Sequence, residues 1–308
     1  MTKKVLVLGG TGFLGKHVME LLRNRPDVEA TSLSRREGTD ILDLPRFTQK
    51  LKEIQPDAII NCAAHVGSVQ YAIQYAGDMI RDNTILAIHT YEGVRLACPI
   101  ATIINPLSNC SYPGDANIHF EPEWQKGVVH DSVLAYGSVK RLINAIAESY
   151  RKQFGIRSIN WLIANAYGPG DDTDPNKVHA LNGILIRLIK AQRASDAVFS
   201  IWGSGKPTRE WVYIDDVAKI MVQSLDMEEQ TYPINLAQNK AYSITEIAEL
   251  GAQALGYDVQ FTYDLSKADG APTKILDDRQ FRAICPDFQF TTLADGIQKT
   301  IEYYKKAI

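Results

Sequence analysis

A glycine-rich turn between a strand and a helix constrains the fold of this chain more than any other feature. The segment GGTGFLG follows a short apolar run and opens a stretch whose apolar residues recur at helical spacing. Gly9 permits a tight turn, Gly12 lets the backbone approach a pyrophosphate, and Gly15 lets the helix pack closely on the strand. The helix N-terminus then meets the phosphate charge. The residues predicted to contact a dinucleotide here are Gly9, Thr11, Gly12, Phe13, Leu14 and Gly15.

After this turn, short β-branched runs alternate with helical patterns, which predicts a parallel sheet covered by helices on both faces. The predicted strands are 5–8, 28–33, 58–61, 100–107 and 157–164, and the predicted helices are 13–25, 44–54, 84–97 and 135–154. Beyond residue 167 the pattern is irregular and rich in Gly, Pro and Asp. Single helices are predicted there at 180–192, 214–225, 244–254 and 293–304.

We therefore expect an α/β fold, a Rossmann-type doubly wound parallel sheet with a smaller C-terminal α/β substrate lobe. Residues 1–170 would form the dinucleotide-binding domain. Residues 171–308 would form mainly the substrate-binding lobe, interleaved with the last strands of the sheet. No repeat or clear linker marks the boundary.

Composition excludes several classes of protein. The chain has 308 residues and a net charge of −3, so nothing in its bulk suggests a surface for nucleic acid or for an anionic membrane. The four cysteines are widely spaced and form no CxxC pair, which predicts neither a metal cluster nor a disulfide framework. No apolar run is long enough to span a membrane, and the start, MTKKVLVLGG, is typical of a strand rather than a signal peptide. We expect a cytoplasmic protein.

The end of the second predicted strand bears on the choice of dinucleotide. A dehydrogenase that uses NAD usually places an acidic residue there, on the ribose diol. This chain has Ser34-Arg35-Arg36, and a guanidinium pairs bidentately with a 2′-phosphate. We therefore expect NADP(H), with Arg35 and Arg36 at the phosphate, rather than NAD(H). Asp43 lies where such folds often place an acid against the adenine amine.

A tyrosine and a lysine stand four residues apart, on one face of a predicted helix. The Lys140 ammonium is expected to lower the pKa of the Tyr136 phenol from about 10. The phenol then exchanges a proton with a carbinol oxygen while hydride moves to or from nicotinamide. Ser108 follows a predicted strand upstream and is expected to hydrogen-bond the same substrate oxygen.

Together these motifs resemble the extended short-chain dehydrogenase/reductase family of sugar-nucleotide epimerases, dehydratases and reductases. The likeness covers nearly the whole chain. It is carried by GGTGFLG, NCAA at 61–64, the Ser108/Tyr136/Lys140 set, NAYGP at 165–169 and REWVYIDD at 209–216. The resemblance implies Ala63, Ala64, Lys140 and Asn165 at the cofactor, with Asn165 also at the substrate. It also implies a homodimer built on the helices around 84–97 and 136–150, and no metal.

Five passages resemble the GDP-L-fucose synthases, which are epimerase-reductases of that family. They are AAHVG at 63–67, SNCSYP at 108–113, His179 followed by Arg187, WGSGKPTRE at 202–210 and DGAPTKILD at 269–277. This likeness implies that Cys110 and His179 move protons at C3 and C5, which the C4 ketone acidifies. A thiol with an ordinary pKa of about 8.5 becomes a base once a neighbour stabilises the thiolate. Reduction at C4 follows, with Tyr136 protonating the oxygen.

The substrate implied is a nucleotide-diphosphate sugar. Arg209 follows a glycine turn and precedes an apolar strand, so its guanidinium is predicted to clamp the diphosphate. Arg187 and Lys274 are predicted to assist, and Trp202 to cover the sugar or the base. The chain departs from the family pattern at four positions that leave the identity of the sugar and of the base open. They are Ser68, Asn109, Asn182 and Thr273, which replace glycine, serine, proline and arginine.

Three other functions remain compatible with parts of the pattern. One is a C4-keto reductase without epimerisation, and another is a sugar-nucleotide 4-epimerase that retains its NAD. Cys110 and the arginines after the second strand argue against the 4-epimerase. A third, from another class, is a non-catalytic NADP-binding regulatory protein, although such proteins typically lose the Tyr or the Lys.

Overall fold

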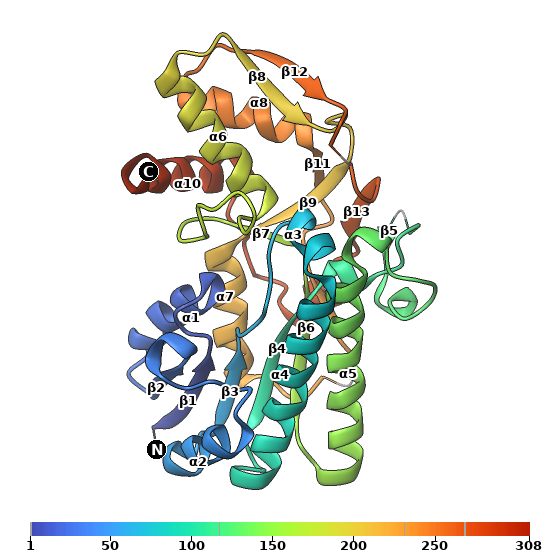
Figure 1. The fold of residues 1–308 in the computed structure, drawn as a ribbon. Coiled ribbons are helices and arrows are strands. Elements are labelled where there is room, and N and C mark those ends of the chain that lie inside the picture. The colour runs from blue at the N-terminus through green and yellow to red at the C-terminus, as the bar shows by residue number, and fades with distance from the viewer. Residues whose placement is uncertain (1, 117, 231, 268) are drawn as a thin grey trace.

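The central element is a six-stranded parallel sheet (Figure 1). The computed structural model describes residues 2–116, 118–230, 232–267 and 269–308. The strand order is β10-β6-β4-β3-β1-β2, with β1 (Lys3–Leu8), β2 (Val28–Leu33), β3 (Ala58–Asn61), β4 (Thr102–Ser108), β6 (Ser158–Ile163) and β10 (Ile234–Leu236). The expected doubly wound parallel sheet is confirmed.

Helices cover both faces of this sheet because each one carries an apolar stripe that must be buried. On one side lie α1 (Phe13–Arg23) and α7 (Ile214–Gln223), which contact each other. On the other lie α2 (Leu44–Ile54), α4 (Ala76–Ala97) and α5 (Leu134–Phe154), with the short α3 (Val69–Gln74) before α4. The two long helices α4 and α5 run side by side in Figure 1.

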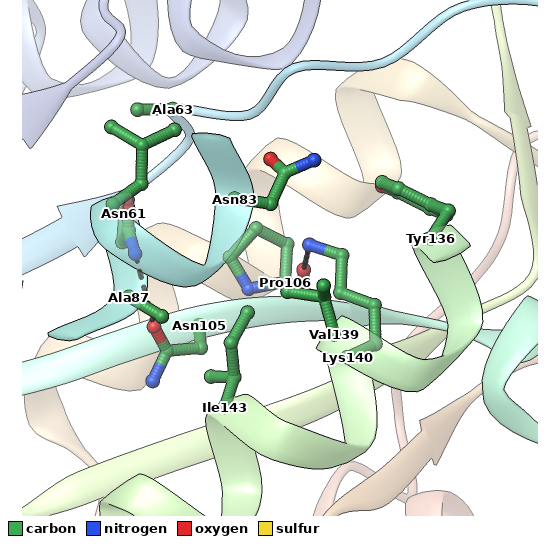
Figure 2. Close-up of a pocket in the computed structure, with 11 residues that line it drawn as sticks. Asn61, Ala63, Asn83, Ala87, Asn105, Pro106, Tyr136, Val139, Lys140 and Ile143 are labelled. Atoms are coloured by element: carbon green, nitrogen blue, oxygen red, sulfur yellow. Dashed lines mark hydrogen bonds between the residues drawn. The ribbon is translucent and has the colours of Figure 1, made fainter. Parts of the chain in front are cut away.

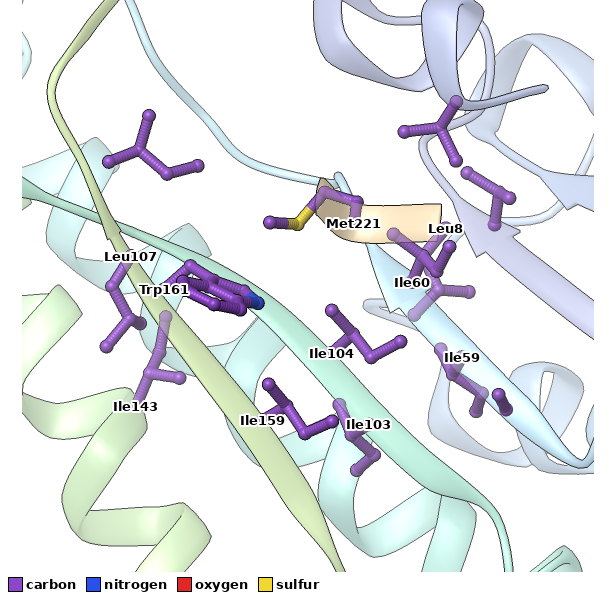
Figure 3. Close-up of a cluster of buried hydrophobic side chains, with 14 of the residues drawn as sticks. Leu8, Ile59, Ile60, Ile103, Ile104, Leu107, Ile143, Ile159, Trp161 and Met221 are labelled. Carbon is purple, nitrogen blue, oxygen red and sulfur yellow. The ribbon is translucent and has the colours of Figure 1, made fainter. Parts of the chain in front are cut away.

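The core of this part combines aliphatic side chains with a small polar network. In Figure 3, Trp161 of β6 belongs to the same buried cluster as isoleucines of β3 and β4. Asn105 of β4 donates to the Tyr91 hydroxyl and to the Asn160 carbonyl, each at 2.9 Å, and Asn160 donates to Asn144 at 3.1 Å. These bonds satisfy polar groups that would otherwise be costly to bury, and they hold α4 and α5 in place against the strands.

A second, smaller part lies at the carboxyl ends of the strands (Figure 1). Its five-stranded sheet contains β11 (Ala241–Ser243), β9 (Thr208–Tyr213), β13 (Thr273–Leu276), β5 (Ile118–His119) and, paired with β9, β7 (Asn165–Tyr167). A two-stranded sheet joins β8 (Val198–Trp202) to β12 (Gln260–Asp264). The helices of this part are α6 (Ala180–Ala194), α8 (Ile244–Leu255) and α10 (Leu293–Ala307), whereas α9 (Arg279–Ile284) packs on β10 and joins the core of the large sheet through Phe281. Helices α6, α8 and α10 pack on one another around a second apolar core.

Most expected helices and strands match the observed bounds closely, but two differences matter. Helix α4 begins at Ala76, eight residues before the expected start at 84, because Met79 and Asn83 of its first turns are buried. The predicted strands did not include the short strands β5, β7, β8, β10, β11, β12 and β13, since each has only two to five residues and pairs with distant segments. Among the described residues, every helix is too short or too polar to cross a membrane.

Candidate active site

The glycine-rich turn has the geometry that close approach to a dinucleotide requires. Gly9 has a φ of +73°, and a Cβ there would lie 2.9 Å from the backbone of Ala63. A Cβ on Gly15 would lie 2.1 Å from the carbonyl oxygen of Gly9. Only glycine fits either position, so the turn packs against the loop after β3 and leaves the N-terminus of α1 open to a phosphate. This cradle fits a bound dinucleotide.

The end of β2 holds an acidic residue that the sequence interpretation did not single out. Glu37 accepts hydrogen bonds from the hydroxyls of Ser32, at 2.8 Å, and of Ser34, at 2.6 Å. Arg35 and Arg36 are exposed beside it on the same single turn of helix. Asp43 caps α2 by accepting the backbone N–H of Arg46 at 3.1 Å. This contact gives Asp43 a structural role, and its predicted contact with adenine remains a prediction.

Tyr136 and Lys140 lie on α5 beside the carboxyl ends of β3 and β4 (Figure 2). The Lys140 ammonium is 5.2 Å from the centre of the Tyr136 ring and donates to the carbonyl oxygen of Pro106 at 2.9 Å. Ala63 and Asn83 line the same pocket. Burial lowers the pKa of Lys140 to about 8, and the nearby cysteines Cys62 and Cys110 only partly oppose this effect.

The prediction that Lys140 lowers the pKa of the Tyr136 phenol is wrong for the protein by itself. Burial raises the pKa of the Tyr136 phenol, and the charge of Cys110 raises it further. The physical reason is that desolvation penalises the phenolate while the ammonium bonds a backbone carbonyl instead of the phenol. Tyr136 is therefore a neutral proton donor in this arrangement, which suits the reduction of a ketone.

Ser108 and Cys110 are held together at the end of β4. Ser108 Oγ accepts the backbone N–H of Cys110 at 3.2 Å, which caps the single turn η2 (Asn109–Ser111). A Cβ on Gly137 would lie 2.4 Å from the carbonyl oxygen of Cys110. The glycine next to Tyr136 thus lets α5 contact the turn that carries Cys110, which places the thiol near the predicted proton donor.

Lys274 reaches the thiol of Cys110. Its ammonium lies 3.5 Å from Cys110 Sγ, although Lys274 is itself a buried residue of β13. Burial by itself would raise the pKa of Cys110, but Lys274, Ser108 and the charge of Arg209 outweigh it and hold the pKa below its usual value. The sequence assigned Lys274 to the diphosphate, and the structure adds a contact that stabilises a thiolate.

His179 stands at the N-terminus of α6, across from the cofactor turn. Its Nδ1 lies 3.0 Å from Oδ2 of Asp171, and its ring centre lies 5.4 Å from that of Phe13. The structure therefore brings His179, a predicted acid/base residue, next to Phe13, the first residue of α1. Asn165 of β7 donates to the carbonyl oxygen of Glu210 at 2.8 Å.

The three predicted ligands of the nucleotide diphosphate lie in two places. Arg209 of β9 neighbours Lys274 of β13 in register, and it donates to the carbonyl oxygens of Thr208 at 2.8 Å and Asp269 at 3.2 Å. Burial lowers the pKa of its guanidinium. Arg187 instead lies over the ring of Trp202, with 4.5 Å from its guanidinium carbon to the ring centre. Trp202 is half exposed, and the ammonium of Lys267 also lies over its ring, 5.7 Å from the ring centre.

The match to a family model shows to which protein family the chain belongs. The model described as "NAD dependent epimerase/dehydratase family" matches residues 5–237. The chain belongs to the NAD-dependent epimerase/dehydratase family. This confirms the family resemblance inferred from the motifs, and the matched region runs from β1, before the cofactor turn, to just past β10, the last strand of the six-stranded sheet along the chain.

Individual members of the NAD-dependent epimerase/dehydratase family align along almost the entire chain. A protein named "Probable GDP-L-fucose synthase" of Drosophila melanogaster is 28% identical over 98% of this chain and 97% of its own length. The GDP-L-fucose synthase of Escherichia coli K12 is 29% identical, covering 89% of this chain and 88% of the relative. The structure of a GDP-L-fucose synthetase from Naegleria fowleri bound to NADP superposes with a TM-score of 0.88, at 24% identity, over 99% of this chain and 95% of that one.

Three carboxylates of this protein, each buried or hydrogen-bonded, were not singled out from the sequence. Glu37 accepts hydrogen bonds from Ser32 in β2 and Ser34 just after it, Asp171 bonds the ring of His179, and Glu210 is fully buried beside Arg209. Burial raises the pKa of Glu210 to about 7. Nothing in the local pattern marks these residues, except that Glu210 adjoins an arginine that the motif had already singled out.

Proposed function

We propose that this protein epimerises a nucleotide-activated 4-keto-6-deoxy sugar, as a GDP-L-fucose synthase does, and then reduces its C4 ketone with NADPH. The contact between Cys110 and Lys274 is the observation that carries the proposal. Two residues after the serine of a Ser/Tyr/Lys set stands a thiol whose pKa is held low by an ammonium 3.5 Å away. A plain reductase has no use for a base in addition to its proton donor.

The cofactor fits the cradle formed by the turn between β1 and α1. Residues Gly9 to Gly15 would hold the pyrophosphate, and the exposed Arg35 and Arg36 would pair with a 2′-phosphate. Bound there, NADPH supplies a hydride to the carbonyl carbon. The NADP-bound relative from Naegleria fowleri supports this choice over NAD.

The chemistry of the sugar divides into two stages. In the first, the Cys110 thiolate removes a proton from a carbon beside the ketone, which forms an enolate. His179 returns a proton to the opposite face of that carbon, so the configuration inverts. In the second stage, hydride adds to C4 and Tyr136 donates its phenolic proton to the oxygen. The sum is substrate, NADPH and one proton giving the alcohol and NADP⁺.

The basic residues of the smaller part would bind the diphosphate. Arg209 is held by backbone carbonyls and Lys274 lies beside it on β13, so both positive charges are fixed before a ligand arrives. Arg187 supports Trp202 from behind through a cation–π contact, which would orient the indole for stacking on a sugar or a base.

The experiment that tests this proposal uses the purified protein, NADPH and GDP-4-keto-6-deoxy-mannose in heavy water. We expect loss of NADPH absorbance and, by NMR, deuterium at C3, at C5 or at both carbons of the reduced product. Reduction without deuterium would make the protein a C4-keto reductase. A failure to react with this sugar and with other 4-keto sugar nucleotides would overturn the proposal.

A homodimer in the cytosol is part of the same proposal. Exposed apolar side chains recur along the outer faces of α4 and α5, where the family resemblance puts the subunit contact. They are Ile80, Ile88, Leu96, Leu142 and Phe154. Ile88→Glu should then convert the dimer to a monomer, as measured by light scattering, whereas an unchanged mass would exclude this face as the interface.

A further inference from the structure

The carboxylate of Asp171 forms hydrogen bonds with His179, the predicted acid/base histidine. Its Oδ2 accepts the backbone N–H of His179 at 2.8 Å and faces Nδ1 of the same ring at 3.0 Å. The side chain of Asp171 is 4% exposed, whereas that of His179 is 33% exposed. Because an ionised carboxylate only accepts hydrogen bonds, the proton between the two must reside on Nδ1.

A third donor comes from a residue at which this chain departs from its family. Asn182 is fully buried, and its side-chain amide donates to the same Oδ2 at 2.9 Å. Its carbonyl oxygen accepts the backbone N–H of Gly168 at 3.0 Å, which fixes the orientation of the amide. Burial alone would raise the pKa of Asp171, but the bonds from His179 and Asn182 outweigh it and keep the pKa below the usual value.

The ring of His179 is also held from the cofactor side. The rings of Phe13 and His179 pack at 5.4 Å with 37° between their planes. Phe13 is the first residue of α1 and directly follows the phosphate cradle. With Nδ1 bonded to Asp171 and one side packed on Phe13, the ring keeps a single orientation, and its Nε2 makes no hydrogen bond with any described residue.

We propose that Asp171, held in place by Asn182, is a positioning residue that fixes His179 as the Nδ1–H tautomer. Nε2 is then the atom that exchanges protons: the neutral ring takes one up there, and the imidazolium so formed gives it to the substrate carbon. This inference rests on the proposed epimerisation, but the state of the ring is measurable without any substrate. A purely structural Asp171, which only caps α6, would hold the backbone N–H and leave the tautomer of the ring unchanged.

The first test is the tautomer, read from long-range ¹H–¹⁵N NMR spectra of protein labelled at its six histidines. The signal of His179 is assigned by its loss in His179→Gln. In the wild type we expect Nδ1 to show the shift of a protonated nitrogen and Nε2 that of an unprotonated one. In Asp171→Ala we expect that preference to disappear, and in Asp171→Asn, which keeps the shape and loses the charge, to weaken.

The second test is solvent deuterium entering the sugar in the presence of NADPH. Loss of a positioned acid/base group lowers the rate of a proton transfer about 100-fold, so we expect the exchange rate to fall by that factor in Asp171→Ala. Asn182→Ala should reduce exchange about fivefold, the effect of one lost hydrogen bond. Asp172→Asn, an exposed neighbour, serves as the matched control and should exchange at the wild-type rate.

The outcomes separate the two proposals. If the wild type exchanges no deuterium, the epimerisation fails, and the NMR spectra still decide the role of Asp171. If the wild type exchanges and Asp171→Ala and Asp171→Asn keep both the Nδ1–H tautomer and the exchange rate, the positioning role is refuted. Should Asp171→Ala fail to fold, Asp171→Asn and Asn182→Ala carry the same decision.

Discussion

At the scale of single residues, the chemistry depends on which charges surround the reacting groups. Sequence motifs singled out Tyr136 and Lys140, and the structure places both in one pocket, but the pKa of the phenol is raised rather than lowered. The effect depends on where the ammonium points, and it points to a backbone carbonyl. The partnership between Cys110 and Lys274 joins residues 164 positions apart, so no local pattern could reveal it.

The low pKa of Cys110 predicts fast alkylation that depends on Lys274. In Lys274→Met the ammonium is lost, the pKa of the thiol rises, and the rate of Cys110 alkylation by iodoacetamide at pH 7 should fall at least about tenfold. Peptide-resolved mass spectrometry gives the rate for each cysteine. Lys274→Arg keeps the positive charge and should retain most of the reactivity. Equal rates in Lys274→Met and the wild type would show that the ammonium does not activate the thiol.

At the scale of elements, the contact between α1 and α7 depends on a charged histidine. His17 of α1 faces Asp215 of α7 at 2.5 Å and the carbonyl oxygen of Pro169 at 2.9 Å. Both partners are acceptors, so both ring nitrogens must carry protons. Burial would lower the pKa of His17, but Asp215 and Pro169 outweigh it and raise the pKa above the usual value.

This pair predicts a stability that falls at alkaline pH. A raised folded-state pKa means that the stabilisation is complete below the unfolded value of about 6.5 and is lost as the pH rises through the folded value. Asp215→Asn should therefore lower the melting temperature by about 2 °C at pH 6 and by less at pH 9.5, a modest effect because Asp215 is 41% exposed. Asp78→Asn, in an exposed pair on α4, should show no such pH dependence. A constant difference for Asp215→Asn would contradict the charged state of His17.

The elements themselves were largely predictable, for a physical reason that also explains the misses. Apolar periodicity and the flanking glycines marked β1, α1 and α5 because each buries a regular face. The two-residue strand β5 and the three-residue strand β11 carry no periodic signal. They form only because tertiary pairing brings them to a longer strand.

At the scale of the whole molecule, the two parts meet around one buried carboxylate. Glu210 of β9 accepts the backbone N–H of Gln238, just after β10 of the large sheet, and that of Leu276 in β13 at 3.0 Å. The chain returns to the large sheet at β10 after contributing β7, β8 and β9 to the smaller part. The division of the chain at residue 170 remains a prediction. The return at β10 means that the C-terminal half also contributes a strand to the large sheet.

The buried state of Glu210 predicts a stability that decreases between pH 5 and pH 8. Its folded pKa of about 7 lies above the value of about 4.3 for a free glutamate, so the unfolded chain releases its proton first and gains relative stability as the pH rises. Over that interval the wild type should lose about 2–3 kcal/mol of unfolding free energy relative to Glu210→Gln, which cannot ionise. Urea denaturation at several pH values gives the difference. Parallel pH profiles for the two proteins would show that Glu210 does not titrate in this range.

The central claim is that one site runs two separable steps, with Cys110 serving only the first and Tyr136 needed for the second. The measurement that tests it most directly follows deuterium incorporation and NADPH oxidation together, in heavy water, for Cys110→Ser and Tyr136→Phe with GDP-4-keto-6-deoxy-mannose. Cys110→Ser should lose at least about 100-fold in deuterium incorporation and still oxidise NADPH by reducing the ketone directly. Tyr136→Phe should incorporate deuterium and oxidise almost no NADPH. Equal loss of both steps in both variants would contradict the account.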